Sequence, residues 1–313
     1  MSLSYKISNY LWRQPWFKPE YGKSIYKMIC QTGEPPDAPF VTDFYGLKYE
    51  GNLQNTIDFS IFYYGAFEKP LLYFLRDCLK ALGRSPSTFC DIGANIGQHS
   101  LFMSRFADTV HAFEPYQVVR DKMQHQINLN DLKNISVHPV GLSDNNQSLP
   151  FFAPTGRNQG IGSFDSGTQS KGNRNIGELA LVIADEYLAD KGIASIDLVK
   201  IDVEGFEKSV LRGLIQTLSR YRPLVVCEIT YGSELSFRSF TDLEKMFPKN
   251  YQFYTFDTRK ADGRKARRRG AKARRSGKYQ LIPFLFDSPR GQDDIVACPE
   301  ELVSVLPMHN PEG

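Results

Sequence analysis

The chain has 313 residues, of which 41% are apolar and 23% are charged, and its formal net charge is +3. This length allows one or two domains with a sizeable core, and the ordinary composition excludes collagen, a coiled coil and wholesale disorder. The charge is unevenly distributed. Residues 259–278 contain eleven Lys or Arg and one acid, a local balance of +10, so the remainder carries −7. The sequence therefore describes an acidic body with one strongly basic segment.

The cellular compartment of the protein can be predicted from targeting signals and from the arrangement of its cysteines. No apolar run approaches the roughly 18 residues of a membrane span, and the N-terminus lacks the apolar stretch and small-residue cleavage site of a signal peptide. The cysteines are odd in number, have no C-x-x-C spacing and lie partly in apolar, strand-like runs. They are Cys30, Cys78, Cys90, Cys227 and Cys298. We therefore expect a reducing, cytoplasmic compartment.

The first 40 residues are rich in aromatic residues and proline, and they contain both tryptophans, Trp12 and Trp16. The i, i+4 spacing of these rings among basic residues is compatible with a membrane-interface segment. Such segments usually have a longer basic amphipathic face, however. We expect instead an arm that packs on the body of the protein or on a second subunit of a homodimer.

The next segment is predicted to form a small hairpin followed by a helix. Residues 42–49 and 56–64 are interpreted as two short strands, with a turn at residues 50–52. Residues 67–82 have the pattern of an amphipathic helix that ends at Gly83.

From residue 89 onward, strand-like and helix-like patterns alternate. Short apolar strands separated by helical patterns are typical of a parallel sheet covered on both faces, so the predicted fold class is a doubly wound α/β sheet. Strands are predicted at 89–92, 109–113, 135–140, 196–201 and 224–229, and helices at 98–106, 118–129, 206–218 and 243–247.

Two departures from this alternation are informative. The last strands, 251–256 and 295–298, have no predicted helix between them, which is expected of an antiparallel edge hairpin with the basic segment in its loop. Residues 156–177 contain six glycines and are predicted to be a mobile surface loop, either a plain connection or a lid over a substrate.

The run FCDIGANIGQHS, residues 89–100, has the pattern of a strand, an acidic and glycine-rich turn, and a helix. In a doubly wound sheet this turn lies at the carboxyl edge, where ligands bind. The spacing from Asp91 through Gly93 to Gly97 is D-x-G-x-x-x-G, which is not the G-x-G-x-x-G of a dinucleotide site. An aspartate here repels a pyrophosphate but suits a cationic ligand such as S-adenosylmethionine. Glu114 ends the next predicted strand, 21 residues after Gly93, where an acid can accept both ribose hydroxyls.

Seven short stretches occur in one order along the chain: 42–46 (TDFYG), 65–68 (GAFE), 91–97 (DIGANIG), 111–115 (HAFEP), 141–144 (GLSD), 197–205 (DLVKIDVEG) and 222–228 (RPLVVCE). In these stretches the sequence resembles the FkbM family of S-adenosylmethionine-dependent methyltransferases. The resemblance implies a seven-stranded, Rossmann-like class I sheet with an antiparallel final strand. It places the methyltransferase domain at residues 86–313, after an N-terminal extension at 1–85.

The resemblance also implies an activity and a set of cofactor contacts. The activity is O-methylation of a hydroxyl on a glycan or a small natural-product acceptor. The methionine end of S-adenosylmethionine is assigned to Asp91, Gly93, Asn95 and Gly97, the ribose to Glu114, the adenine rim to Ser143 and Asp144, and a further contact to Glu68.

An alcohol acceptor is a poor nucleophile, so a base placed at its oxygen is expected to help. Asp202 and Glu204 follow the strand predicted at 196–201, and Asp202 is the first choice for the base, although it can also cap the next helix. His99, at the start of the helix after the glycine-rich turn, is a further candidate. As an alternative that is not favoured, Asp202, Glu204 and Glu228 hold a divalent cation that lowers the acceptor's pKa.

The basic segment has three competing interpretations. We favour a solvated, disordered hairpin loop, because runs of like charge usually behave in this way. The second is an anionic partner, such as a lipid surface or a phosphorylated acceptor. The third is RNA or another anionic polymer as the acceptor, although residues 259–278 contain no aromatic residue on which bases can stack.

Overall fold

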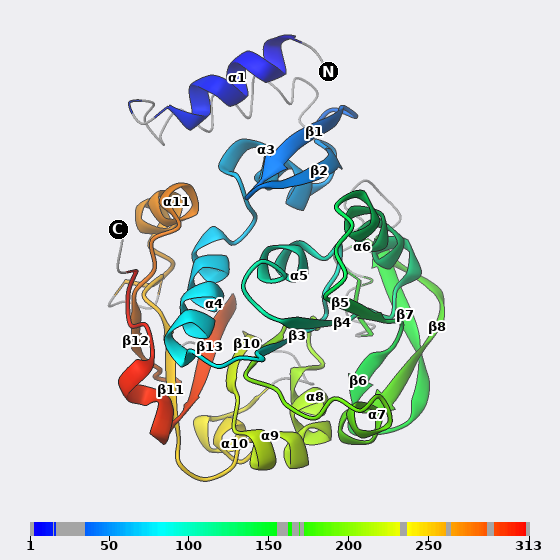
Figure 1. The fold of residues 1–313 in the computed structure, drawn as a ribbon, viewed down its shortest axis with the longest axis vertical. Helices are drawn as coiled ribbons and strands as arrows, with labels where there is room; N and C mark the ends of the chain where they lie inside the picture. The colour runs from blue at the N-terminus through cyan, green and yellow to red at the C-terminus, as the bar shows by residue number, and fades with distance from the viewer. Residues whose placement is uncertain are drawn as a thin grey trace.

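An eight-stranded mixed sheet forms the centre of the structure, with helices on both faces (Figure 1). The computed structural model describes residues 3–14, 16, 35–154, 162–164, 169, 172–231, 237–260, 264–286 and 291–310. The strands are β3 (Thr88–Ile92), β4 (Thr109–Phe113), β5 (Ile135–His138), β9 (Leu198–Ile201), β10 (Leu224–Tyr231), β11 (Tyr251–Phe256), β12 (Leu281–Pro283) and β13 (Gly291–Pro299).

The strand order is β12-β11-β13-β10-β9-β3-β4-β5. The five strands from β10 to β5 are mutually parallel, whereas β13 runs antiparallel to both β10 and β11. Without β12, the sheet has the seven strands and the antiparallel last strand that the family resemblance implies. β12 extends the sheet by one short strand beyond β11.

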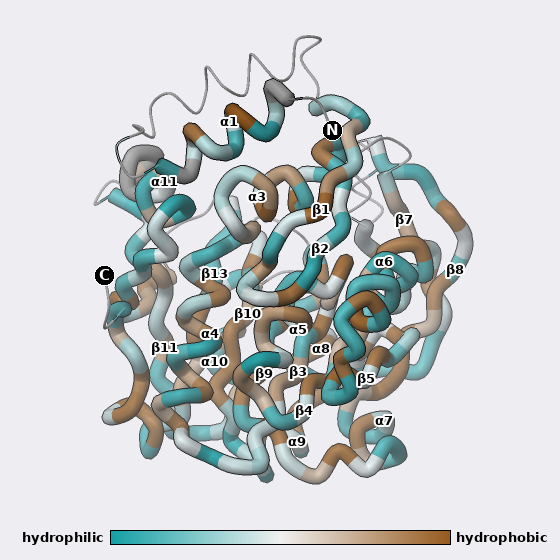
Figure 2. The backbone as a smooth tube through the Cα atoms, turned by 45° about the horizontal axis from the view of Figure 1, so that its top comes forward, coloured by the Kyte–Doolittle hydropathy of each residue, from teal (hydrophilic) through white to brown (hydrophobic). Residues whose placement is uncertain are grey.

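Helices cover the two faces of this sheet and enclose two separate hydrophobic cores. One face carries α4 (Lys69–Leu82), α5 (Gln98–Met103) and α6 (Gln117–Leu129), and the other carries α7 (Ala184–Asp190), α8 (Glu207–Gly213), α9 (Ile215–Tyr221) and α10 (Phe240–Glu244). In Figure 2 the central strands are mainly hydrophobic, as expected of strands buried on both faces. The helix predicted at 206–218 is divided at Leu214 into α8 and α9.

The prediction of two strands before residue 65 was wrong in part. β1 (Pro39–Phe44) pairs with β2 (Leu47–Asn52), so the turn lies at residues 45–46 and not at 50–52. Residues 56–64 form the helix α3 (Thr56–Tyr64). Its start is fixed by Asn55, whose side chain accepts hydrogen bonds from the N–H groups of Ile57 and Asp58, and its end by Gly65 in the left-handed conformation. These local signals outweigh the β-like aromatic composition of the segment.

A second sheet of three strands lies beside the carboxyl edge of the main one. It has the order β6-β8-β7 and consists of β6 (Gly141–Ser143), β7 (Gln147–Pro154) and β8 (Asn173–Ile183). The prediction of a surface loop over residues 156–177 was therefore wrong for 173–177, which form the start of β8 and pair with β7 at residues 173–175. Gly177 adopts a positive φ of 115° there, and no atom lies within 4 Å of the position that a Cβ would occupy. Apart from residues 162–164, 169 and 172–177, the glycine-rich segment lies outside the described residues.

The basic segment lies between β11 and β13 as predicted, but it is not an irregular loop. It contains α11 (Arg267–Ser276), and the expectation of no helix between these strands was wrong. Alanine, lysine and arginine are strong helix formers, and the bases in the last turn interact favourably with the helix dipole. α11 packs on α4, where Lys69 Nζ donates a hydrogen bond to the carbonyl of Arg275 (3.2 Å).

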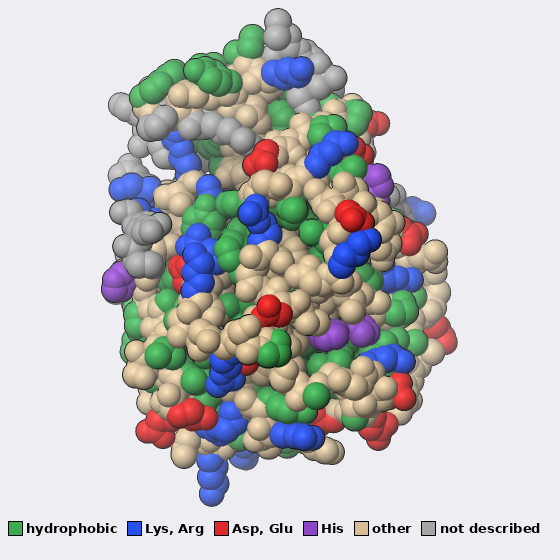
Figure 3. Space-filling view, viewed as in Figure 1, with side chains coloured by type: hydrophobic (Ala, Val, Ile, Leu, Met, Phe, Trp, Pro, Cys, Tyr) green, Lys and Arg blue, Asp and Glu red, His purple; other side chains and the backbone are tan. Residues whose placement is uncertain are grey.

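The N-terminal arm packs on the body through α1 (Leu3–Arg13), which lies over α3 (Figure 1). The Trp12 side chain is buried and meets the Tyr64 ring edge-on, with 5.3 Å between the ring centroids. Ile7, Tyr10 and Trp16 are exposed, and hydrophobic side chains along α1 are visible at the top of Figure 3. None of the described helices is long and apolar enough to cross a bilayer. Four cysteines are buried free thiols, and Cys30 lies outside the described residues.

Candidate active site

The glycine-rich turn after β3 is fixed at the carboxyl edge of the sheet by its backbone. The N–H groups of Gly93 and Ala94 both donate to the carbonyl of Phe113 at the end of β4, at 3.0 Å each. Gly93 has a φ of +80°, and a Cβ at this position would lie 1.9 Å from the carbonyl oxygen of Asp202. The turn after β3 and the turn after β9 are thus in direct contact, which only glycine permits.

Glu114 is buried at the end of β4 and its carboxylate is oriented by two backbone donors. The N–H of Asn95 donates to one oxygen (2.9 Å) and the N–H of Tyr116 donates to the other (2.8 Å). Burial raises the pKa of Glu114 to about 7, although both backbone hydrogen bonds favour the charged form. Each carboxylate oxygen has a second lone pair, so the group can accept hydrogen bonds from a ligand as well.

A cavity opens beside Glu114, between the ends of β3, β4 and β9 and the three-stranded sheet; we call it the edge cavity. It is lined by Gly93, Asn95, Glu114, Pro115, Tyr116, Leu142, Asp202 and Glu204, together with the aromatic rings of Phe151, Phe164 and Phe206. The Phe164 ring lies 5.0 Å from Phe151 and 5.3 Å from Phe206, measured between centroids. The edge cavity therefore combines an oriented carboxylate with an aromatic wall suited to a flat heterocycle.

A second cavity, of about 230 Å³, adjoins the first and shares Gly93, Asn95, Asp202 and Glu204 with it. We call it the acidic cavity, because its lining also includes Glu68, His99, Lys200, Glu228 and Gln292. Three of its residues, Glu68, Asn95 and Glu204, adopt positive φ values of 48°, 53° and 48°. Non-glycine residues in this conformation are strained, and such strain concentrates at functional sites.

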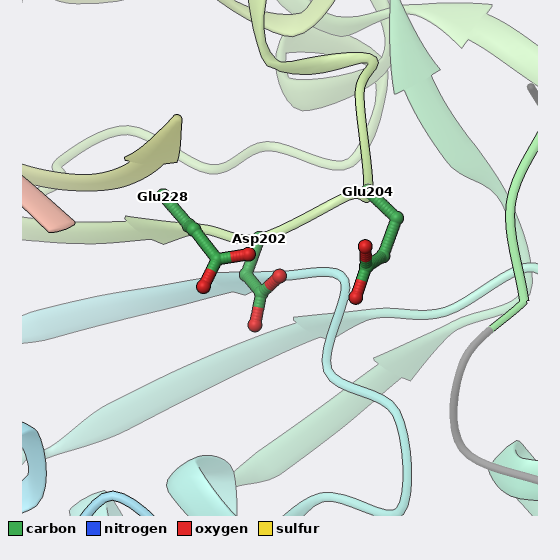
Figure 4. Close-up of side chains that lie close together, drawn as sticks. All are labelled: Asp202, Glu204 and Glu228. Atoms are coloured by element: carbon green, nitrogen blue, oxygen red, sulfur yellow. The ribbon is translucent and has the colours of Figure 1, made fainter. Parts of the chain in front are cut away.

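Three carboxylates meet in the acidic cavity. Asp202 and Glu204 follow β9, Glu228 lies on the neighbouring strand β10, and one oxygen atom from each lies within 4.8 Å of the others (Figure 4). Burial, together with Asp202 and then Asp294, raises the pKa of Glu228 to about 10. Burial, with Asp294 and Asp202 nearby, likewise raises the pKa of Glu68 to about 8. Burial is the main cause of both shifts, and the neighbouring carboxylates raise the two pKa values further.

Lys200 is the ammonium group among these carboxylates. It is 3% exposed, and its Nζ lies 3.1 Å from Asp202 Oδ2 and 3.9 Å from Asp91 Oδ1. Burial lowers the pKa of Lys200, but Asp202 and Asp91 raise it by more, so that the lysine stays charged. The sequence analysis did not assign a role to Lys200. A lysine inside the apolar strand Leu-Val-Lys-Ile is nevertheless a signal in the sequence, because a buried lysine is almost always paired with an acid.

His99 lines the acidic cavity from the first turn of α5. The residue is 7% exposed, its Nε2 lies 3.7 Å from Glu68 Oε2, and this nitrogen has no hydrogen-bond partner in the described part of the chain. Burial, and then the charge of Lys200, lower the pKa of His99 well below its ordinary value. The imidazole is therefore neutral at physiological pH.

Four of the predicted cofactor residues do not line either cavity. Asp91 is fully buried beneath the turn, where its Oδ2 accepts a hydrogen bond from Ser100 Oγ (2.7 Å). Gly97 is packed against the Met123 side chain, whereas Ser143 and Asp144 follow Leu142 at the end of β6. A role for these residues in holding the cofactor stays a prediction.

A third cavity, of about 450 Å³, lies between α4, α11 and the edge strands; we call it the insertion cavity. Glu68 lines both this cavity and the acidic cavity. Asp294 on β13 also lines the insertion cavity. Its outer wall includes Lys272 and Ser276 of α11, so the basic insertion borders the site rather than standing apart from it.

Together, the strand order, the acid-and-glycine turn after the first strand and the acid that ends the second define a class I methyltransferase fold. Residues 91–254 match the family model described as the methyltransferase FkbM domain, which spans half of the chain. The chain belongs to the FkbM methyltransferase family.

Curated relatives are also methyltransferases. "Methyltransferase 1" of Beauveria bassiana (strain ARSEF 2860) is 26% identical over 185 residues, which are 52% of this chain and 74% of that protein. "Methyltransferase sdnD" of Sordaria araneosa is 30% identical over 155 residues, which are 40% of this chain and 59% of that protein. The chain therefore spans less than two thirds of the length of the second relative.

The chain is also similar to parts of two solved structures. A methyltransferase FkbM from Methylobacillus flagellatus KT gives a TM-score of 0.41 at 17% identity, covering 67% of this chain and 43% of that one. A SAM-dependent methyltransferase from Agrobacterium tumefaciens gives 0.43 at 10% identity, covering 86% of this chain and 72% of that one.

Proposed function

We propose that this methyltransferase uses S-adenosylmethionine to methylate a hydroxyl group of a glycan or a small natural-product acceptor. The observation that carries the proposal is the continuity of the two cavities. The edge cavity has the carboxylate and the aromatic wall that suit a nucleoside, and it shares Asp202 and Glu204 with the acidic cavity, where an acceptor hydroxyl can meet a base.

The residues present fit the cofactor. Glu114 would accept hydrogen bonds from the ribose hydroxyls, Phe151 and Phe164 would flank the adenine, and the turn at Gly93 would bring the backbone close to the methionine end. When bound, S-adenosylmethionine supplies a methyl carbon activated by positive sulfur. The protein's main task is then to align the acceptor and to exclude competing water.

Asp202 is the first choice for the group that takes the hydroxyl proton. Asp202 lines both cavities, and its carboxylate is held in place by Lys200 at 3.1 Å. Asp202→Asn should lower turnover by roughly 10²- to 10⁴-fold with little change in cofactor affinity. Unchanged turnover in that variant would remove Asp202 from the mechanism.

A second candidate function is methylation or binding of RNA or another anionic polymer. The observation in its favour is that α11 exposes Lys272 and Arg274 beside the insertion cavity. Such contacts would address phosphates and would weaken steeply as salt is raised.

One experiment addresses both candidates. Purified protein and radiolabelled S-adenosylmethionine are incubated with extract separated into glycan, lipid, RNA and small-molecule pools, and label is followed into each pool. Label in the glycan or small-molecule pool is the expected result, whereas label in RNA alone would favour the second candidate. Calorimetry with S-adenosylmethionine and NAD is run in parallel, and tight binding of NAD alone would contradict methyl transfer to either class of acceptor.

A further inference from the structure

We propose that Asp202, Glu204 and Glu228 bind one divalent cation of the Mg²⁺ or Mn²⁺ class in the acidic cavity. Binding of the ion is an inference from these residues alone. Its role at the acceptor hydroxyl rests on the proposed function.

The first observation is the geometry of the carboxylates. Oxygen atoms from the three side chains lie within 4.8 Å of one another. Two oxygens on opposite sides of one hard cation are roughly 4 to 5 Å apart, given metal–oxygen distances of about 2.0 to 2.6 Å. The three groups therefore need little movement to share one ion. Asp202 and Glu204 follow the end of β9, and Glu228 lies on the neighbouring strand β10, as Figure 4 shows, so that an open side remains for water and an acceptor oxygen.

The second observation is that the cavity contains polar groups whose bonding needs its own residues do not meet. Glu228 is half-buried in this cavity, and its carboxylate has no hydrogen-bond or ion-pair partner among the residues that the structure describes. The Nε2 atom of His99 is buried in the same cavity without a hydrogen-bond partner among those residues. A buried nitrogen without a hydrogen-bond partner, such as His99 Nε2, is rare in proteins and indicates a missing ligand or water.

The third observation is the charge balance. The described lining of the acidic cavity supplies four carboxylates, from Glu68, Asp202, Glu204 and Glu228, against the single ammonium of Lys200. That ammonium lies between Asp91 and Asp202 and therefore neutralises only one side of the group. A divalent cation adds two positive charges at the point where carboxylates from two strands converge.

Asp202 and His99 are both candidates for the base that takes the hydroxyl proton. Binding of the ion would give them different roles. With the ion bound, Asp202 would be one of its ligands, Lewis acidity would lower the pKa of the acceptor hydroxyl, and the neutral His99 Nε2 would take the hydroxyl proton. The oxygen lone pair forms the bond to the methyl carbon as the carbon–sulfur bond breaks, and its electron pair leaves with sulfur as a neutral thioether. The imidazolium then returns its proton to water.

The test measures binding of Mn²⁺ alone, by calorimetry and by the loss of the free-ion electron paramagnetic resonance signal. We expect one Mn²⁺ per chain in the wild type, displaced by excess Mg²⁺. Glu228→Gln and Glu204→Gln should each weaken this binding roughly tenfold or more, because the number of charged ligands sets affinity. Glu178→Gln, the same change at an exposed position on β8, should leave it unchanged.

Two controls make each outcome decisive. Circular dichroism shows whether each variant is folded, and calorimetry with S-adenosylmethionine is run on the same samples. Failure of the wild type to bind Mn²⁺, or equal binding by all four proteins, would overturn the metal site. If S-adenosylmethionine still binds in that case, the proposed function survives, whereas loss of S-adenosylmethionine binding by the folded wild type would contradict the proposed function instead.

Discussion

At the scale of single residues, Glu114 connects cofactor recognition to pH. Its pKa is raised by burial to about 7, so the ligand-free protein carries a neutral carboxylic acid below that pH. Ribose hydroxyls are hydrogen-bond donors and prefer the carboxylate. Binding must therefore remove a proton below pH 7, and affinity must fall as the pH decreases.

The first prediction is that affinity for S-adenosylmethionine decreases on acidification, approaching tenfold per pH unit well below about pH 7. Calorimetry at about pH 6 and about pH 8 measures the difference. Glu114→Gln should bind more weakly by about 1.5–3 kcal/mol at the higher pH, because a charge-assisted hydrogen bond is lost. The variant should also lose most of the pH dependence, and an undiminished dependence would assign it to another group.

The second prediction compares two glycines that both have positive φ. Gly83 ends α4 with open space on its side, whereas a Cβ on Gly93 meets the backbone of Asp202 at 1.9 Å. Gly83→Ala should cost about 1 kcal/mol from backbone strain alone. Gly93→Ala should cost about 3 kcal/mol or more, because two turns must separate. Urea unfolding measures the loss of unfolding free energy in both variants. Equal losses would show that the two turns can separate without strain.

The sequence alone indicates those cavity-lining residues that lie within one β-α-β unit or directly follow a strand. Gly93, Asn95, Glu114 and Asp202 satisfy this condition, and the structure brings them together at the cavities. Asp294 could not be placed, because it approaches from β13, an antiparallel strand whose pairing with β10 depends on the whole sheet. Sequence separation of this kind leaves no local signal.

At the scale of elements, the cofactor side of the site depends on how α8 supports β6. Gly213 in α8 lies so close to β6 that a Cβ there would be 1.9 Å from the carbonyl oxygen of Ser143. β6 in turn presents Gly141 and Leu142 to the edge cavity. A helix on one face of the sheet thus determines the position of the cavity wall.

The third prediction follows from this contact. Gly213→Ala should lower the free energy of unfolding by about 2 kcal/mol and weaken cofactor binding, because overpacking must push β6 away. Gly270→Ala is the matched control: it is also a helical glycine, in α11, with nothing within 4 Å of its added Cβ. That change should be neutral or should stabilise by up to about 1 kcal/mol. Equal effects of the two substitutions would mean that the backbone of β6 adapts freely.

Elements were predicted well where apolar periodicity and long-range packing agree, as in β3, β4 and α4. They were predicted poorly where a cap outweighs composition. Asn55 and Gly65 enclose an aromatic segment that resembles a strand but forms α3. In α11 the error was opposite, because a run of like charge was taken to prevent order, whereas packing on α4 and strong helix formers favour a helix.

At the scale of the whole molecule, three segments far apart in the sequence meet above the sheet: α1, α3 and α11. The Trp12 ring is 4% exposed and lies edge-on to Tyr64, and the guanidinium carbon of Arg275 lies 5.8 Å from its centroid. Arg275 also donates a hydrogen bond to the carbonyl of Gln14. The basic insertion is therefore connected to the N-terminal arm, and α11 in turn forms part of the wall of the insertion cavity.

The fourth prediction tests whether this arm is part of the cooperative fold. Trp12→Ala should lower the free energy of unfolding by about 3 kcal/mol, because a large buried ring and its contacts with α3 and α11 are lost. Trp16→Ala is the matched control, since that ring is 67% exposed, and it should change stability by no more than about 0.5 kcal/mol. Urea unfolding followed by circular dichroism measures both, and limited proteolysis should cleave α11 faster in Trp12→Ala only. Equal stabilities would mean that the arm opens independently of the sheet, and that the wall of the insertion cavity is not held by α1.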